Sequence, residues 1–82
     1  MSDKEQLEIN LNGEPFAIES GYTVADLLVK ISNNPKATAD SPQSFGAVAV
    51  ELNAEIVPRD QFTMIQLKQN DAVEVVTLVG GG

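Results

Sequence analysis

The sequence predicts an α+β fold in which a mixed four- to five-stranded sheet wraps one main helix. Three observations predict it: apolar residues alternate near the N-terminus, one central stretch has helical spacing, and a nearly continuous apolar segment precedes the C-terminal glycines. The 82 residues suffice for one core and are too few for a deep cleft between two lobes. We expect a single domain over 1–82, with an N-terminal extension (1–6), a long loop (33–46) and a flexible glycine tail (80–82).

The first predicted element is a β-hairpin. Apolar and polar residues alternate on both sides of Asn12-Gly13, which is the spacing of strands with one buried face. The Asn-Gly dipeptide favours a two-residue hairpin turn because both residues readily adopt positive φ. The alternating apolar positions are Leu7, Ile9, Leu11, Phe16 and Ile18.

A helix is predicted next. Four apolar residues recur at i, i+3, i+4 and i+7, which forms one stripe of an amphipathic helix: Val24, Leu27, Leu28 and Ile31. Thr23 is the expected N-cap, and Asp26 stands where a capping box places an acid and where the helix dipole favours negative charge. The sequence Asn33-Asn34-Pro35 ends the helix near Ser32.

A long loop and a second hairpin follow. Residues 33–46 contain two prolines and several small polar residues without either period, so we expect a loop that is mobile or functional. Residues 47–52 alternate as a strand, Asn53-Ala54 can turn, and 55–57 can pair back.

The last part of the chain contains the expected central strand. Residues 59–62 predict a turn or a single helical turn, and 65–67 a brief edge strand. Residues 72–79 are nearly continuously apolar and rich in β-branched side chains, which is typical of a strand covered on much of both faces. Because one helix stripe is the only available cover for the sheet, these elements favour the ubiquitin-like β-grasp.

Composition excludes several classes of function. The chain has no cysteine and no histidine, so it lacks disulfides, thiolate nucleophiles, imidazole bases and the usual zinc, haem and iron–sulfur ligands. Its formal net charge is -7 and its five basic residues are scattered, which argues against nucleic acid and favours basic protein surfaces as partners. No leader-like or bilayer-spanning stretch is seen, so a cytoplasmic protein is expected.

Side chains offer no self-contained active site. We expect the carboxylates to be solvated surface groups: Glu14, Glu19, Asp26, Glu51, Glu55 and Asp71. Arg59 follows a proline in a turn and could bind an acidic group, but a surface or carbonyl-capping role is favoured. Tyr22 and Phe62 are expected at the edge of the core. No catalytic side chain, bound cofactor or metal is predicted.

The three terminal glycines need another explanation. At average usage, three glycines at a given position would arise by chance in roughly 3 of 10,000 chains. Glycine lacks Cβ, so a tail of Gly80, Gly81 and Gly82 can enter a narrow channel in a partner and bring its backbone against a nucleotide. The reactive group would then be the terminal carboxylate.

Two segments resemble a known family. The C-terminal segment Glu74-Val-Val-Thr-Leu-Val-Gly-Gly-Gly82 and the internal segment Val50-Glu-Leu-Asn-Ala-Glu-Ile-Val-Pro-Arg59 are similar to the ThiS family, the sulfur carriers of thiamine biosynthesis. The resemblance extends over about residues 7–82. The chain departs from the family pattern in its longer loop, and in Ala54, where glycine is common.

The resemblance implies a protein cosubstrate and no enzyme. A ThiF-type adenylating enzyme would use ATP to adenylate the Gly82 carboxylate, and sulfur from a cysteine desulfurase relay would convert the adenylate to a thiocarboxylate. Thiazole synthase (ThiG) would then consume this sulfur. Gly80 and Gly81 would give the slim approach to the partner's channel, and Leu78 and Val79 would contact the partner.

Three other readings remain open from the sequence. A carrier related to the small subunit of molybdopterin synthase, MoaD, would share the same terminal chemistry. A ubiquitin-like modifier would be joined to lysines through Gly82. A plain interaction module would keep its function without the last two glycines. A monomer is expected when the protein is free.

Overall fold

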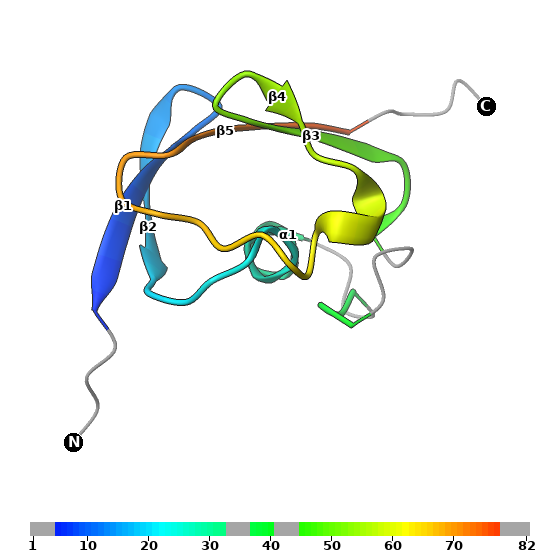
Figure 1. Cartoon of the computed structure of the whole chain (residues 1–82), viewed down its shortest axis with the longest axis horizontal. Coiled ribbons are helices and arrows are strands. Elements are labelled where there is room, and N and C mark those ends of the chain that lie inside the picture. The colour runs from blue at the N-terminus through cyan, green and yellow to red at the C-terminus, as the bar shows by residue number, and fades with distance from the viewer. Residues whose placement is uncertain (1–4, 33–36, 41–44, 78–82) are drawn as a thin grey trace.

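A computed structural model of the chain describes residues 5–32, 37–40 and 45–77. Five strands form one mixed sheet in the order β2-β1-β5-β3-β4, and the helix α1 (Val24–Ile31) packs against one face of it (Figure 1). The strands are β1 (Gln6–Leu11), β2 (Glu14–Glu19), β3 (Val48–Leu52), β4 (Glu55–Ile56) and β5 (Ala72–Thr77). This arrangement confirms the predicted β-grasp fold.

Both predicted hairpins are present, and both turn on left-handed residues. Asn12 (φ 52°) and Gly13 (φ 86°) connect β1 to β2 in a register that pairs Leu11 with Glu14. Asn53 (φ 53°) and Ala54 (φ 72°) connect β3 to β4. Positive φ at both central residues is the conformation of a type I′ turn, whose twist matches that of the flanking strands.

The N-terminus of α1 carries the expected capping box. The Asp26 main-chain N–H donates to the Thr23 hydroxyl oxygen at 3.1 Å, and the Thr23 main-chain N–H donates to an Asp26 carboxylate oxygen at 2.9 Å. Each side chain thus satisfies one main-chain donor of the first turn. Ser32 is the C-cap, at the predicted end of the helix.

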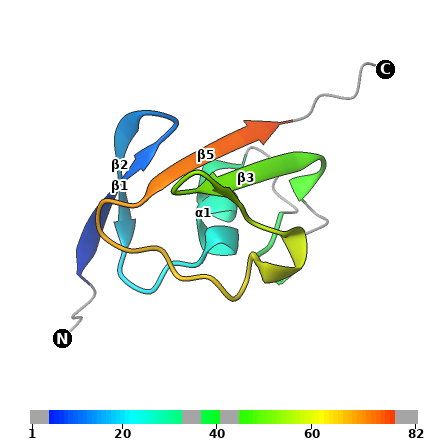
Figure 2. The same ribbon diagram turned by 45° about the horizontal axis from the view of Figure 1, so that its top comes forward.

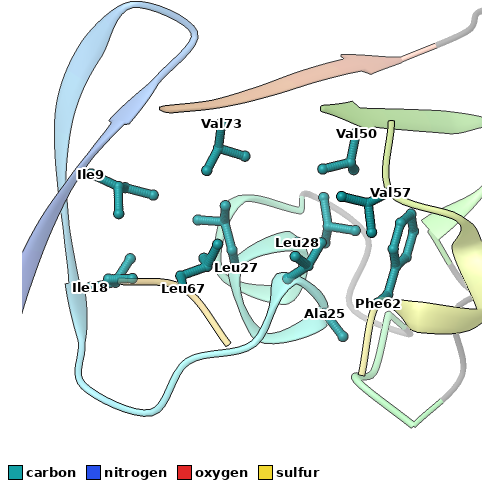
Figure 3. Packing of buried hydrophobic residues seen from close by; sticks show 11 residues of the cluster. Ile9, Ile18, Ala25, Leu27, Leu28, Val50, Val57, Phe62, Leu67 and Val73 are labelled. Atoms are coloured by element: carbon teal, nitrogen blue, oxygen red, sulfur yellow. The ribbon is translucent and has the colours of Figure 1, made fainter. Parts of the chain in front are cut away.

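One core fills the space between sheet and helix. Figure 3 shows apolar side chains of the sheet pointing toward those of α1, with Phe62 and Val57 closing one end. The buried cluster comprises Ile9, Ile18, Val24, Ala25, Leu27, Leu28, Val50, Val57, Phe62, Leu67 and Val73. Three of the four predicted stripe residues are buried, and Ile31 packs against the cluster while remaining partly exposed.

The predicted edge strand at 65–67 is wrong. This segment forms only an isolated bridge between Thr23 and Gln66, although the Leu67 main-chain N–H donates to the Tyr22 carbonyl oxygen at 2.8 Å. Leu67 is buried, so its side chain fixes the segment to the core while the main chain pairs only once. The helical turn predicted just before it is confirmed as the 3₁₀ helix η2 (Arg59–Gln61).

The predicted central position of β5 is confirmed, but the prediction that much of both its faces is covered is wrong. Val73 is 1% exposed on the helix side, whereas Val76, on the opposite side, is 52% exposed. The single helix covers one face of the sheet, so apolar residues that face outward meet solvent. Among the described residues, no helix is long and apolar enough to cross a membrane.

Candidate functional site

The predicted site residues follow directly after the central strand. Thr77 is the last residue of β5, and the predicted sulfur-carrying Gly82, the channel glycines Gly80 and Gly81, and the contact residues Leu78 and Val79 lie outside the described residues. The structure therefore describes the strand that precedes this segment, β5, and the surfaces beside that strand.

The strand β5 has a hydrogen-bonded partner on each edge. On one edge, β3 runs antiparallel to β5 from the pair Leu52–Val73 to the pair Val48–Thr77. On the other edge, β1 runs parallel to β5 and pairs with it at only two positions, Asn10–Ala72 and Leu11–Val73. The strand that precedes the terminal glycines is thus an interior strand with a partner on each edge.

Two turn asparagines extend the support of β5. The Asn12 main-chain N–H donates to the Val73 carbonyl oxygen at 2.8 Å, and the Val75 main-chain N–H donates to Asn12 Oδ1 at 2.9 Å. Because the main chain turns away at Asn12, its side-chain carbonyl takes the place that the next main-chain carbonyl of a parallel strand would occupy.

Asn53 supports the start of the same strand from the other edge. Its main-chain N–H donates to the Ala72 carbonyl oxygen at 2.7 Å, and its Oδ1 accepts from the Ala72 main-chain N–H at 2.9 Å. Its Nδ2 donates to Asp71 Oδ1 at 3.1 Å. Sequence reasoning assigned both asparagines only to turns, because it could not show that their side chains reach a strand distant in the sequence.

An apolar groove lies beside the C-terminal end of β5. It has a volume of about 470 Å³ between the end of α1 and the helix-facing side of the sheet. Its lining consists mainly of Leu28, Ile31, Phe45, Val48, Val75 and Thr77, with Ser32 at the end of the helix. An open apolar hollow on the surface is a place where a partner could seat a side chain.

The outer face of the sheet combines acidic and apolar residues. Glu51 on β3 and Glu74 on β5 are directly paired, and Ile56 pairs with Glu51 from the other side. Val76 lies two residues beyond Glu74 and so shares its face, and both Val76 and Ile56 are more than half exposed. Like charges placed opposite each other disfavour the free sheet, and a basic partner would relieve their repulsion.

Arg59 has the favoured carbonyl-capping role. Its Nη2 donates to the Gly46 carbonyl oxygen at 2.8 Å, and its guanidinium lies 5.9 Å from the centre of the Phe62 ring. Phe45 lies beside Phe62 with ring centres 6.5 Å apart. Arg59 therefore fastens the chain that precedes β3 to η2, and Phe62 is a core residue rather than an edge residue.

The predicted acids are mostly surface or structural groups. Glu14, Glu19 and Glu55 are exposed, whereas Asp26 caps α1 and Asp71 accepts from the Lys68 main-chain N–H at 2.7 Å. Within the described part of the chain, no group of three or more potential metal-ligating residues is found. Of these acids, Asp71 is linked to β5, through its hydrogen bond with Asn53.

Comparison with known proteins agrees with this organisation. The model of the ThiS family matches residues 9–82. The crystal structure of the thiamine biosynthesis protein ThiS from Geobacter metallireducens has a TM-score of 0.67 and 28% identity, covering 93% of this chain and 100% of that one.

Sequence relatives include proteins of two sizes. A thiazole synthase from Magnetococcus marinus is 36% identical over 76 residues, which cover 93% of this chain and 20% of that protein. The uncharacterized protein Ycf40 of Pyropia yezoensis is 34% identical over 93% of both chains. The chain thus spans about a fifth of the length of the thiazole synthase and nearly all of Ycf40. Because the family match covers the domain through its last glycine, this chain belongs to the ThiS family, and its membership supports the role of a sulfur carrier.

Proposed function

We propose that this protein is the sulfur carrier of thiamine biosynthesis, and that the carboxylate of Gly82 carries the sulfur. The observation that supports this most is the extent of the family match, which runs from residue 9 through residue 82 and so includes all three terminal glycines. The fold adds that these glycines follow the central strand of the sheet.

The proposed chemistry has three steps: adenylation, sulfur transfer and reduction. The Gly82 carboxylate oxygen attacks the α-phosphorus of ATP in a ThiF-type adenylating enzyme, which forms an acyl-adenylate and releases pyrophosphate. A persulfide sulfur delivered by a cysteine desulfurase relay then attacks the acyl carbon, AMP leaves, and reduction of the resulting acyl disulfide by a thiol gives the thiocarboxylate. Adenylation is needed because a carboxylate is a poor electrophile and AMP is a good leaving group.

In this proposal the carrier supplies the acyl group that reacts and the surfaces that the partner enzyme recognises. ATP belongs to the partner enzyme, and the carrier needs no cofactor of its own. Gly80 and Gly81 pass through the narrow part of the enzyme because they lack Cβ, while Leu78 and Val79 contact its entrance. The fixed strand β5 limits the directions from which the glycines approach, which reduces the entropy lost on binding.

Thiazole synthase is the proposed acceptor of the sulfur. A protein named thiazole synthase from Magnetococcus marinus contains a stretch similar to this chain that amounts to a fifth of its length. Joining a donor to its acceptor in one chain raises the effective concentration of each for the other. This relative therefore supports thiazole synthase as the partner of the carrier, in the cytoplasm where these enzymes would act.

Reconstitution tests the proposal. The purified chain, a ThiF-type enzyme, ATP, a sulfide source and thiazole synthase with its small substrates should form the thiazole product, and a Gly82 deletion should form none while retaining the same circular dichroism spectrum. If the intact chain is converted to a thiocarboxylate that only the large subunit of molybdopterin synthase consumes, the thiamine assignment is wrong. Conjugates to lysine would instead indicate a ubiquitin-like modifier.

A further inference from the structure

The two edges of β5 are not equally covered near its C-terminal end. The strand β3 accompanies β5 to Thr77, whereas the last β1 residue that pairs with it is Leu11, opposite Val73. Figure 2 shows the end of β5 running past the β1–β2 hairpin with β3 along one edge. The other edge therefore lacks a strand partner within the described residues once Asn12 has bonded to Val75.

The hydrogen-bonding groups on this open edge can be identified. Val73 and Val75 direct main-chain groups toward the β1 side, as their bonds with Asn12 show. Since main-chain groups alternate between the two sides of a strand, the carbonyl of Val75 and the N–H of Thr77 also point to this side. In an extended chain, these two groups match the N–H and carbonyl of a single residue of an added parallel strand.

The surroundings of the edge indicate what kind of strand fits. On the helix side, Val75 and Thr77 line the apolar groove, so side chains of an added strand that face this way meet an apolar hollow. On the outer side lie the exposed Val76 and the carboxylate of Glu74. A strand with apolar residues facing the groove and a basic residue facing outward is complementary to both sides.

We propose that this edge, the Val75 carbonyl and the Thr77 N–H, receives an extended segment of the enzyme that acts on the C-terminal glycine, by strand addition to the sheet. The inference rests on the proposed function, because an enzyme that reaches Gly82 must approach along the end of β5. A second copy of this chain is disfavoured as occupant, since pairing would bring the Glu74 side chains and two net charges of -7 together.

Amide hydrogen exchange tests the proposal without altering the chain. The isotope-labelled carrier is measured free and bound to a ThiF-type adenylating enzyme. In the complex, the exchange rate of the Thr77 amide should fall by about tenfold or more, because this amide gains a hydrogen bond there. The Val76 amide, which points toward β3, should be protected in both states, and the exposed Thr63 amide should be unaffected by the enzyme.

A substitution separates strand addition from simple burial. Thr77→Pro removes the N–H of the open edge and leaves the bonds between β3 and β5 intact, because this N–H points away from β3. It should weaken binding to the enzyme by about tenfold. Thr77→Val keeps the N–H and should bind within about twofold of the original chain. Circular dichroism checks that both variants fold.

Each result has a distinct meaning. If the complex forms and Thr77 exchanges as fast as in the free carrier, or if folded Thr77→Pro binds normally, strand addition is wrong while sulfur carriage stands. If no complex forms with an enzyme that is active on another carrier, both proposals fail. Protection of Thr77 in the free carrier that rises with its concentration would show that a second copy occupies the edge, which also overturns the proposal. Should Thr77→Pro not fold, the exchange measurement decides.

Discussion

At the scale of single residues, two turn asparagines both shape their turns and hydrogen-bond to the central strand. Asn12 and Asn53 both adopt positive φ, and both place side-chain oxygens on main-chain N–H groups of β5. Asparagine is suited to this because it tolerates the left-handed region and can replace a main-chain carbonyl. Sequence reasoning predicted the turns from local preferences, but the bonds to β5 depend on the tertiary fold and could not be predicted.

Ala54 is the strained member of the second turn. It has φ 72° and is exposed, and an L-residue in the left-handed region costs about 1–2 kcal/mol. Ala54→Gly removes this strain and loses about 0.4–1 kcal/mol through the freer unfolded chain. We expect a net rise in the free energy of unfolding of about 0.8 kcal/mol, the difference between the midpoints of these ranges, measured by urea denaturation.

Ala17→Gly is the matched control for this change. Ala17 is exposed within β2 and has an ordinary strand conformation, so the same chemical change should lower the free energy of unfolding by about 0.5–1 kcal/mol. Destabilisation by Ala54→Gly as large as that of the control would contradict the assignment of strain to the turn.

The capping box provides a second prediction for a single residue. Thr23→Ala removes the acceptor for the Asp26 main-chain N–H and should lower the free energy of unfolding by about 1 kcal/mol, as seen by thermal or urea denaturation. Thr63→Ala is the control, because Thr63 is exposed and forms no side-chain hydrogen bond with the described residues. Equal stability of the two variants would show that the cap contributes nothing.

At the scale of elements, α1 holds the sheet together. Leu28 is 3% exposed, contributes to the core and lines the groove. Leu28→Ala should cost about 2–5 kcal/mol through lost burial and the cavity left behind, measured by urea denaturation. Met64→Ala, at a side chain 75% exposed, should change stability by no more than about 0.5 kcal/mol. A loss below about 1 kcal/mol for Leu28→Ala would mean that α1 is not the main support of the sheet.

The elements with strong local patterns were predictable, and those fixed by packing were not. Helical spacing and the capping pair placed α1, and alternation with turn residues placed both hairpins. Residues 65–67 alternate like a strand, yet Leu67 is buried while the main chain makes only one bridge, through Gln66. Apolar content alone could not show that Val76 faces solvent.

At the scale of the whole molecule, charge predicts how the carrier meets its partners. With a formal net charge of -7, association with a basic enzyme surface should be steered by electrostatics. Raising the salt concentration from about 0.1 M to about 1 M shortens the screening length from about 10 Å to about 3 Å. Stopped-flow association with a ThiF-type enzyme should slow by about tenfold, with little change in dissociation. A salt-independent association rate would contradict electrostatic steering.

The functional site was predicted from the chain end and the family resemblance, and the structure supplies its support. Sequence reasoning predicted Gly80, Gly81 and Gly82 as the reactive segment, which lies outside the described residues. It could not reveal the open edge at Thr77. That edge arises because β1 pairs with β5 only as far as Val73, whereas β3 pairs with it as far as Thr77.

The intact mass of the protein tests most directly whether Gly82 carries sulfur. After incubation with ATP, a ThiF-type adenylating enzyme and a sulfide source, the mass should rise by the difference between one sulfur and one oxygen atom, with fragment masses placing the change on Gly82. The Gly82 deletion should show no gain. An unchanged mass of the intact chain, with an enzyme that converts another carrier in the same reaction, would contradict the account.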